Sequence, residues 1–395
     1  MQTLARRAMR LPGPLHPDSA DAISLDSGYA FPEIFPDLTR AAARALTVFR
    51  SESLQYGSPY GLRPMREWIA QYMRDDGAAV TAENVIVVNG AKHGLELICR
   101  LLVDDGDAVV VTGPTYFTAI PILRSFGLTF IEVPQDEEGL DVVMLAKRLA
   151  QRERDRLPAP KFIYDVPDFH NPSGITMSLR RRQALLALAT SRSIPIVEDS
   201  PYRRLRFEGS SEPSLKSLDR SGIVFALGTF SKLIAPGLRI GWICAEADSI
   251  VRIAQLKSDG GTAPMTQRII VEFFADGGLE PQIARARAAY GEHRDRMIEA
   301  VRRDLPSAVF TPPHGGYYLW LRFPDGIDTG VLAERAFEAG VSPIAGNAFF
   351  AADDPSSARA QGIPSHYMRL AYSNATPDRI DRGVKLLADT LRSME

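Results

Sequence analysis

Short apolar runs rich in β-branched residues recur through the middle of the chain, and most of them end in a turn with glycine, proline or asparagine. Runs of this kind are typical of buried strands. The predicted strands cover residues 85–88, 107–112, 129–133, 161–166, 194–197, 223–227 and 239–244. Because strands that alternate with helices form parallel sheets covered on both faces, the pattern predicts an α/β fold with a mainly parallel sheet.

Helical periodicity dominates other parts of the chain. Residues 38–48 predict a short amphipathic helix with Asp37 as its N-cap, and residues 64–74 predict another helix. The segment 245–303 is mainly helical. Its charge-rich part, residues 283–302, predicts a long, solvated connecting helix.

The chain is long enough for two domains. Its 395 residues exceed one typical domain, and an apolar content of 45% supports a large core. Two further strands are predicted after the long helix, at 315–321 and 367–372. We expect an N-terminal arm and part of a small domain at 1–55, a large domain at 56–285 and the rest of a smaller α/β domain at 286–395.

Composition excludes several classes of protein. The formal net charge of −2 provides no global field for nucleic acid or for a membrane surface. No apolar run approaches the roughly 20 residues that cross a bilayer, and residues 1–11 lack the apolar region of a secretory signal. Cys99 and Cys244 lie in apolar runs, as expected of buried thiols in a reducing compartment, which favours a cytoplasmic protein. Their spacing is not that of a metal site, and no metal is expected.

The segment from Gly228 to Trp242 combines a buried strand, a lysine and a Pro-Gly turn. Lysine is rare at such a place unless the site uses it, and a desolvated lysine near other cations becomes a nucleophile able to form a Schiff base. Thr229, Ser231 and Arg239 surround Lys232 with two hydroxyl donors and one planar cation, which suits a phosphate group. The alternative is a surface lysine at the end of a strand.

This segment resembles a known cofactor motif. Ser/Thr-x-Ser/Thr-Lys followed by Pro-Gly-Leu-Arg-x-Gly is similar to the cofactor-lysine motif of fold-type I pyridoxal-phosphate enzymes. Within that group the chain resembles the class I/II aminotransferases, especially the 2-aminoadipate and MocR-like branch, over roughly residues 25–390. The resemblance implies pyridoxal 5′-phosphate as the cofactor, held by Lys232 as a Schiff base and bound at its phosphate by Thr229, Ser231 and Arg239.

A second phosphate-binding element is expected at Gly90-Ala91-Lys92, between the strand 85–88 and a helical pattern. Free backbone N–H groups and the helix dipole at such a turn attract anions. The resembled family usually has Gly-Ser/Thr-Gln here, so this chain lacks the hydroxyl and keeps the backbone donors. Lys92 either adds charge to the phosphate or points to solvent, and an ordinary strand-to-helix turn is the alternative for the whole motif.

Three turns resemble those that hold the cofactor ring. Tyr116 ends Gly-Pro-Thr-Tyr, whose aromatic ring stacks on the pyridine in the family. Asn171 begins Asn-Pro-Ser-Gly, and its amide can donate to the phenolic oxygen of the cofactor. Asp199 and Tyr202 match the family's Asp-x-x-Tyr, which implies that Asp199 keeps the ring nitrogen protonated and that Tyr202 contacts the phenolic oxygen. Glu198 should point to the opposite face of its strand and be structural.

The remaining candidates concern the substrate and a second subunit. Arg369 lies in an apolar strand, where an unpaired arginine is costly, and it matches the family's arginine that holds the substrate α-carboxylate. Gly28 matches the arm glycine that lets backbone approach the substrate, and Asn171 is also expected there. Tyr56 lies in a Tyr-Gly-x-x-x-Gly loop that, in the family, sends its hydroxyl to the neighbouring subunit's cofactor, which implies a homodimer with shared active sites. Alone, Tyr56 would be an interface or core aromatic.

The resemblance implies an aminotransferase that moves an amino group between an L-amino acid and a 2-oxo acid, with no nucleic-acid or membrane partner. Two alternatives stay open. The same residues would serve pyridoxal-phosphate-dependent elimination, replacement, cyclisation or oxidation of an amino acid in specialised metabolism. A MocR-type regulator would use this domain to sense the cofactor, but it needs a helix-turn-helix segment, and only about 30 residues precede the domain. The side chain of the substrate is not predicted.

Overall fold

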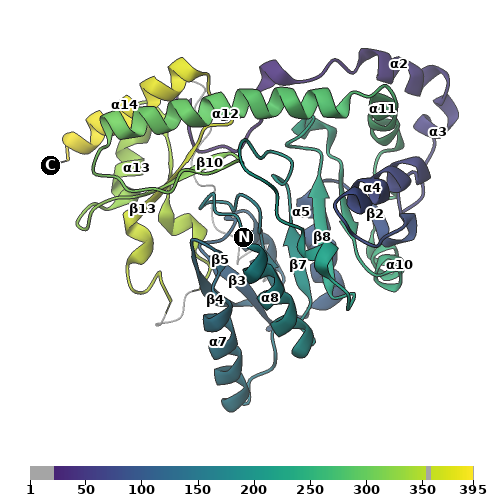
Figure 1. Cartoon of the computed structure of the whole chain (residues 1–395), viewed down its shortest axis with the longest axis horizontal. Coiled ribbons are helices and arrows are strands. Elements are labelled where there is room, and N and C mark those ends of the chain that lie inside the picture. Colours follow the sequence, from purple (N-terminus) through teal and green to yellow (C-terminus); the bar gives the residue numbers. More distant parts are fainter. Residues whose placement is uncertain (1–21, 353–356, 395) are drawn as a thin grey trace, which may run out of the picture.

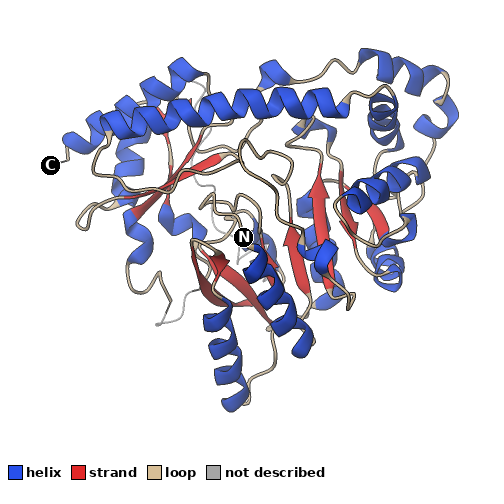
Figure 2. Ribbon diagram, viewed as in Figure 1, coloured by secondary structure: helices blue, strands red, loops and turns tan. Residues whose placement is uncertain are grey.

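The computed structural model describes residues 22–352 and 357–394, so the expectations for residues 1–21 lie outside the described residues. Its largest feature is a sheet of eight strands surrounded by helices, with a smaller α/β unit beside it (Figure 1). Figure 2 shows the strands as two groups, the larger sheet in the centre and right of the view and the smaller sheet at the left. The α/β expectation is confirmed.

The large sheet is mainly parallel, as predicted. Strands β4, β3, β6, β7 and β8 run parallel to one another, whereas β9 is antiparallel to both β8 and β2, and β5 is antiparallel to β4. In spatial order the strands are β2 (Val85–Val88), β9 (Gly241–Cys244), β8 (Val224–Thr229), β7 (Ile196–Asp199), β6 (Ile163–Asp165), β3 (Ala108–Gly113), β4 (Thr129–Asp136) and β5 (Gly139–Leu140).

Helices cover both faces of this sheet, which explains why its strands are apolar on both sides. Alternate residues of β3 belong to different cores: Ala108 and Val110 pack with α7 and α8, and Val109 and Val111 pack with α5 and α6. The helices around the sheet are α4 (Arg63–Asp75), α5 (Ala91–Leu102), α6 (Ala119–Ser125), α7 (Val142–Arg154), α8 (Leu179–Ser191), α9 (Leu215–Leu218), α10 (Ala247–Leu256) and α11 (Pro264–Ala275).

The smaller unit has its own core, to which both ends of the chain contribute. Ile23 and Leu25 pack there with residues from 297 onward. Its antiparallel sheet has the order β10 (Tyr318–Arg322), β13 (Tyr367–Ala371) and β12 (Ile344–Ala345), and β1 (Ile23–Ser24) pairs with β11 (Val341–Ser342). The other elements of this unit are α13 (Thr329–Glu338), α14 (Pro377–Arg392), η4 (Gly346–Phe349) and η5 (Ile363–His366).

Helix α12 (Leu279–Asp304) joins the two units (Figure 1). The long connecting helix predicted here is confirmed. The prediction that this helix is solvated is only partly right. Ile283 and Tyr290 are buried in the large core, and Met297 and Val301 are buried in the small one. The apolar stripe is hidden among charged residues because it occupies one face of an otherwise exposed helix.

The segment before α4 contains η1 (Pro32–Ile34), α2 (Thr39–Thr47) and α3 (Arg50–Leu54), and η2 (Ala82–Asn84) and η3 (Pro236–Leu238) are short turns elsewhere. Helix α2 begins one residue later than predicted, with Leu38 at the N-cap position. The Asp37 carboxylate still accepts from the backbone N–H of Thr39 at 2.8 Å. None of the helices within the described residues is long and apolar enough to cross a membrane.

Candidate active site

A cavity of about 500 Å³ lies where the carboxyl ends of β3, β6, β7 and β8 meet. Ligands of open α/β sheets bind at this edge, because the loops that leave the strands converge there. Most of the residues singled out in the sequence line the cavity: Gly28, Ala91, Lys92, Tyr116, Asn171, Asp199, Tyr202, Thr229, Ser231, Lys232 and Arg239. They come from turns far apart in the chain, and the fold brings them together.

Lys232 lies in the turn after β8, and its amine faces the cavity. The Nζ atom donates to the backbone carbonyl of Gly28 at 2.6 Å. Burial of the amine, and then the nearby cations Arg369, Lys92 and Arg239, lower the pKa of Lys232 to about 8. A substantial neutral fraction at mildly alkaline pH makes this amine a usable nucleophile and base.

Arg239 approaches the start of α5 closely. It has a left-handed backbone with φ of 53°, and its Nη2 donates to the carbonyl of Asn89 at 3.1 Å. Gly90, the N-cap of α5, has φ of 84°, and a Cβ on this residue would lie 2.5 Å from the Arg239 Nη2. Glycine is therefore needed at position 90 both for the backbone conformation and for the approach of the guanidinium.

The other groups at this end of the cavity are hydroxyls and one lysine. Thr229 Oγ1 lies 2.9 Å from Ser231 Oγ and 3.1 Å from the carbonyl of Ile240. Lys92 is the second residue of α5 and lines the cavity rather than pointing away from it. Burial and then the charge of Arg239 lower the pKa of Lys92. Two cations, two hydroxyls and the free N–H groups of a helix start thus converge on one end of the cavity.

Asp199 ends β7 and is the one carboxylate that the described residues contribute to the cavity lining. Its Oδ2 accepts from the Tyr164 hydroxyl at 2.8 Å, whereas Oδ1 is buried without a hydrogen-bond partner. Burial raises the pKa of Asp199 to about 6, and the bond from Tyr164 acts in the opposite direction. Sequence reasoning missed Tyr164; the available signal was a phenol in the middle of a short predicted strand, where a buried hydroxyl needs a partner.

Asn171 lines the cavity and pairs with Arg369, which is not among the lining residues. Arg369 Nη1 donates to Asn171 Oδ1 at 2.9 Å, and Arg369 Nη2 donates to the backbone carbonyl of Asp26. The Nδ2 of Asn171 and the Nε of Arg369 are buried without a partner. The guanidinium lies over the rings of Tyr318, at 4.1 Å, and Phe349, at 5.0 Å. These contacts hold a fully buried cation in one orientation.

Tyr116 and Tyr202 also line the cavity. Burial raises the pKa of Tyr116, and it raises the pKa of Tyr202 well above the ordinary value. The Tyr202 hydroxyl donates to that of Tyr318 at 3.1 Å. Both phenols therefore stay protonated near neutral pH and remain hydrogen-bond donors.

Tyr56 does not reach the cavity of its own chain. Its side chain is 89% exposed, and it is absent from the lining residues. The role predicted for Tyr56, a contact made in a neighbouring subunit, stays a prediction. It is the one candidate whose side chain lies on the surface far from the other site residues.

His170 takes part in a buried hydrogen-bond network beside Asn171. Its Nε2 lies 3.2 Å from Thr112 Oγ1, and its Nδ1 lies 3.1 Å from Ser173 Oγ. Burial lowers the pKa of His170 to about 3, so the ring is neutral. Within residues 22–352 and 357–394, no group of three His, Cys, Asp or Glu residues could hold a metal ion.

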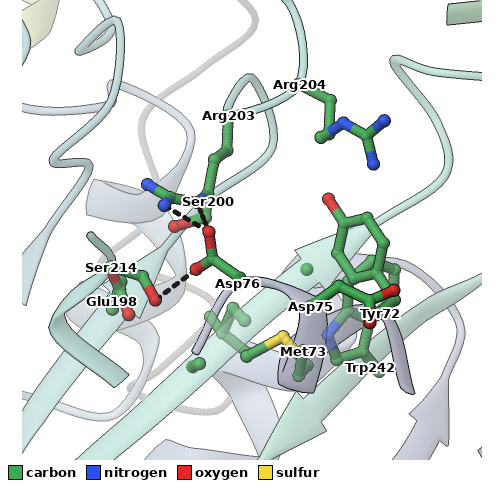
Figure 3. Close-up of a pocket in the computed structure, with 13 residues that line it drawn as sticks. Tyr72, Met73, Asp75, Asp76, Glu198, Ser200, Arg203, Arg204, Ser214 and Trp242 are labelled. Atoms are coloured by element: carbon green, nitrogen blue, oxygen red, sulfur yellow. Dashed lines mark hydrogen bonds and ion pairs between the residues drawn. The ribbon is translucent and has the colours of Figure 1, made fainter. Parts of the chain in front are cut away.

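A second cavity, of about 230 Å³, lies beside Glu198, which neighbours Asp199 in β7 (Figure 3). Its charged groups are largely paired: Asp76 accepts from Arg203 and from Ser214 Oγ. Glu198 accepts from the backbone N–H groups of Leu215 and Lys216 at 2.8 and 2.9 Å. Glu198 therefore caps α9, which agrees with the structural role predicted for it.

The chain is similar over most of its length to several known proteins. A model of the family described as aminotransferase class I and II matches residues 21–385. An aromatic-amino-acid aminotransferase of Thermococcus litoralis is 35% identical over 381 residues, which cover 95% of this chain and 89% of that enzyme. The crystal structure of the α-aminoadipate aminotransferase of Thermus thermophilus, complexed with N-(5′-phosphopyridoxyl)-L-leucine, is 30% identical, with a TM-score of 0.87 over 99% of this chain and 97% of that one. An uncharacterized HTH-type transcriptional regulator of Bacillus subtilis is 29% identical over 93% of this chain and 73% of its own.

Proposed function

The chain belongs to the class I and II aminotransferases, which use pyridoxal 5′-phosphate, and we propose that it transfers amino groups between an L-amino acid and a 2-oxo acid in the cavity around Lys232. The observation that carries the assignment of this cavity is a set of unsatisfied polar groups. Asp199 Oδ1 and Asn171 Nδ2 are buried without partners beside a lysine whose pKa is lowered to about 8. Buried polar groups normally have partners, so a ligand that pairs with these two atoms would fit the cavity.

The cation-lined end of the cavity fits a phosphate. Lys92 and Arg239 line it, and no described carboxylate forms an ion pair with either of them. Thr229 and Ser231 would add hydroxyl donors, and Gly90 and Ala91 would add backbone N–H groups at the start of α5. Together these groups would hold the phosphate of the cofactor by charge and by hydrogen bonds.

The other unsatisfied atoms fit a pyridine ring with a phenolic oxygen. Asp199 Oδ1 would accept from the protonated ring nitrogen, because it is an acceptor without a donor. Asn171 Nδ2 would donate to the phenolic oxygen, and Tyr116 would pack against the ring. The Tyr202 hydroxyl would donate to the same oxygen after turning its single hydrogen away from Tyr318. When bound, the cofactor supplies a carbonyl carbon that accepts the amino group and a ring that withdraws electrons from the reacting carbon.

The chain's own residues would bind the substrate and move its proton. Arg369, with Asn171 beside it, would hold the α-carboxylate, since each Nη carries a second hydrogen besides those donated to Asn171 and Asp26. The neutral Lys232 amine would take the proton from the α-carbon of the substrate and deliver it to the cofactor carbon that receives the amino group. Gly28 would bring its backbone against the substrate, and it already contacts Lys232.

The substrate side chain would meet an apolar wall. Tyr29, Leu95, Phe117 and Ile122 line the cavity together with Thr118. The cations that the described residues contribute to the lining are Lys92, Arg239 and Lys232. The first two are matched to the phosphate and the third is the reacting amine, so no lining cation remains to pair with a second carboxylate. The relatives act on aromatic amino acids and on α-aminoadipate, and this lining supports aromatic and other apolar donors over acidic ones for this chain. The ratio of kcat/KM for phenylalanine and leucine to that for glutamate and 2-aminoadipate tests this preference; a ratio below one contradicts it.

Tyr56 would act in a homodimer. It is exposed in a region where Leu46, Val48 and Leu54 are exposed as well, and Met265 of α11 adds to this apolar surface. We propose that a second copy of the chain covers it and receives Tyr56 at its phosphate site. Mixing Lys232→Ala and Tyr56→Phe proteins tests the idea, because a mixed dimer would then contain one intact site. Activity that does not exceed that of either parent after mixing contradicts shared sites.

Absorbance spectra test the function itself. The purified protein should show the bound cofactor, lose that band when an amino acid is added and regain it with a 2-oxo acid. A Lys232→Ala protein that turned over at the wild-type rate would refute the assignment. Release of ammonia or of a side-chain fragment would favour elimination or replacement, and cofactor binding without any amino-group transfer would favour a regulator. We place the protein in the cytoplasm, because Cys99 and Cys244 are both free and buried, as a reducing compartment allows.

A further inference from the structure

Tyr164 lies on β6, directly beside the strand that ends in Asp199. The two strands are parallel, with Tyr164 opposite Val197. The Tyr164 side chain is 0% exposed, and its ring belongs to the large core. A phenol in such a place needs a hydrogen-bond partner. The partner here is the Asp199 carboxylate, the only acidic group that the described residues place in the cavity lining.

The bond decides which carboxylate oxygen is available to a ligand. The Tyr164 hydroxyl donates to Asp199 Oδ2 at 2.8 Å, and Oδ1 has no partner. Rotation of the carboxylate would break the bond from Tyr164, so the bond fixes the direction in which Oδ1 points. Tyr164 itself is absent from the lining residues, and it would act only through Asp199.

The bond also affects the charge of Asp199. Burial raises the pKa of Asp199 to about 6, and the hydrogen bond from Tyr164 lowers it. Burial raises the pKa of Tyr164 well above its ordinary value, so the phenol remains a donor. The charge of Asp199 also acts on Tyr116, in the turn after β3, whose pKa is raised mainly by burial. Without the hydrogen bond from Tyr164, the increase that burial causes in the pKa of Asp199 would not be offset.

We propose that Tyr164 is a positioning residue of the active site: its hydroxyl keeps the Asp199 carboxylate ionised and leaves Oδ1 free for the ring nitrogen of pyridoxal phosphate. The proposal rests on the proposed function, because the bond matters for catalysis only if Asp199 pairs with that ring nitrogen. A merely structural tyrosine would stabilise the core without affecting the charge of the cofactor ring.

The test compares Tyr164→Phe with Tyr372→Phe. Tyr372 is a matched control, since it is fully buried and its hydroxyl donates to the carbonyl of Gly315 at 3.0 Å, away from Asp199. In Tyr164→Phe we expect kcat for the amino-acid half-reaction to fall about 10- to 100-fold, the size of a lost hydrogen bond to a charged group. We expect KM for the amino acid to change little, because Tyr164 does not touch the substrate.

Two readouts separate this role from a structural one. The acid limb of the pH profile of kcat/KM should move to higher pH in Tyr164→Phe and stay in place in Tyr372→Phe. In the cofactor-free protein, carboxyl NMR of labelled aspartate should show the Asp199 signal, assigned with Asp199→Asn, titrating at higher pH in Tyr164→Phe. If Tyr164→Phe does not fold, 3-fluorotyrosine at position 164 keeps the shape and strengthens the donor, and it should lower the titration midpoint of Asp199.

The outcomes are distinguishable. An unchanged acid limb and an unchanged Asp199 titration in either Tyr164 variant would overturn the inference while leaving cofactor binding by the wild type intact. Equal losses of kcat in Tyr164→Phe and Tyr372→Phe would also overturn it, since a general loss of packing would then be the cause. A wild-type protein that binds no pyridoxal phosphate would instead overturn the proposed function itself.

Discussion

Gly28→Ala is expected to disturb both the arm and Lys232. A Cβ on Gly28 would lie 2.0 Å from Tyr318 Oη and 3.1 Å from Tyr318 Cζ. The first approach is impossible, so either the arm or the Tyr318 ring must move. Forcing extra atoms into a packed site costs about 1–3 kcal/mol. Because the Gly28 carbonyl accepts from Lys232 Nζ at 2.6 Å, a displaced arm also loosens that bond.

Removing the clashing hydroxyl provides a quantitative test. Tyr318→Phe alone should cost about 1 kcal/mol, because the Tyr202 hydroxyl loses its acceptor. In the double variant the closest remaining approach is the 3.1 Å contact to Cζ, which a small shift accommodates. The double variant should therefore be more stable than the sum of the single changes predicts, by about 1–2 kcal/mol.

The free energies of unfolding of the four proteins, from urea titrations, measure this coupling. Gly291→Ala serves as the control, since a Cβ on that helical glycine would meet Phe207 only at an ordinary distance of 3.8 Å. We expect the control to be neutral or slightly stabilising. Additive costs of Gly28→Ala and Tyr318→Phe would refute the reasoning, because the clash would then not be the cause.

Three further predictions concern other parts of the structure. Asp168→Ala should destabilise the protein by about 3–5 kcal/mol in calorimetry, because Arg182, at 0% side-chain exposure, loses its nearer carboxylate at 2.8 Å and keeps only Glu198 at 3.8 Å; a cost near zero would contradict this. In the cofactor-free protein, the rate at which Lys232 reacts with pyridoxal, which has no phosphate, should rise with pH with a midpoint near 8, and a midpoint at the ordinary lysine value of 10.5 would argue against burial as the cause. Gly90→Ala should weaken pyridoxal-phosphate affinity about tenfold in fluorescence titrations, since its Cβ would strain the backbone and displace Arg239, and an unchanged affinity would count against the predicted phosphate site.

Seven of the eight strands of the large sheet could be predicted because they contain apolar runs bounded by turn residues, whereas the two-residue strand β5 was not predicted. Strand β2 coincides with the predicted residues 85–88, and the ends of the other strands differ by up to three residues. The order of the strands could not be predicted, and neither could the antiparallel direction of β9. Strand order depends on which distant edges pair, and an apolar strand carries no local signal of its neighbour.

The α12 helix illustrates a different limit. Its many charged residues predict solvation, and the burial of Tyr290 and Met297 was not predicted. Charge counts average over all faces of a helix, whereas burial follows a single stripe of residues three and four positions apart. The two cores that this helix joins exist only in the folded chain. Nothing in the local sequence therefore indicates that one face of the helix packs against both of them.

Some residues of the candidate site could likewise be predicted from local sequence, and others depend on the fold. Motifs with fixed turns, such as the one that presents Asn171, could be read from the sequence because glycine and proline set the local backbone. Tyr164 could not, because its importance arises from a neighbouring strand. The exposed position of Tyr56 is equally a property of the folded chain, since the sequence alone allowed an interface or a core aromatic.

The hydrogen bonds that hold the site join residues from opposite ends of the chain. Arg369 and Asn171 are 198 positions apart, and Lys232 and Gly28 are 204 positions apart. An arginine in an apolar strand indicates that an acceptor must exist, because an unpaired buried charge is too costly, but it does not indicate which acceptor. The sequence therefore predicts the requirement, and the fold supplies the partner. For this reason substitutions at Gly28 or Asn171 should act through Lys232 and Arg369, although no local pattern connects them.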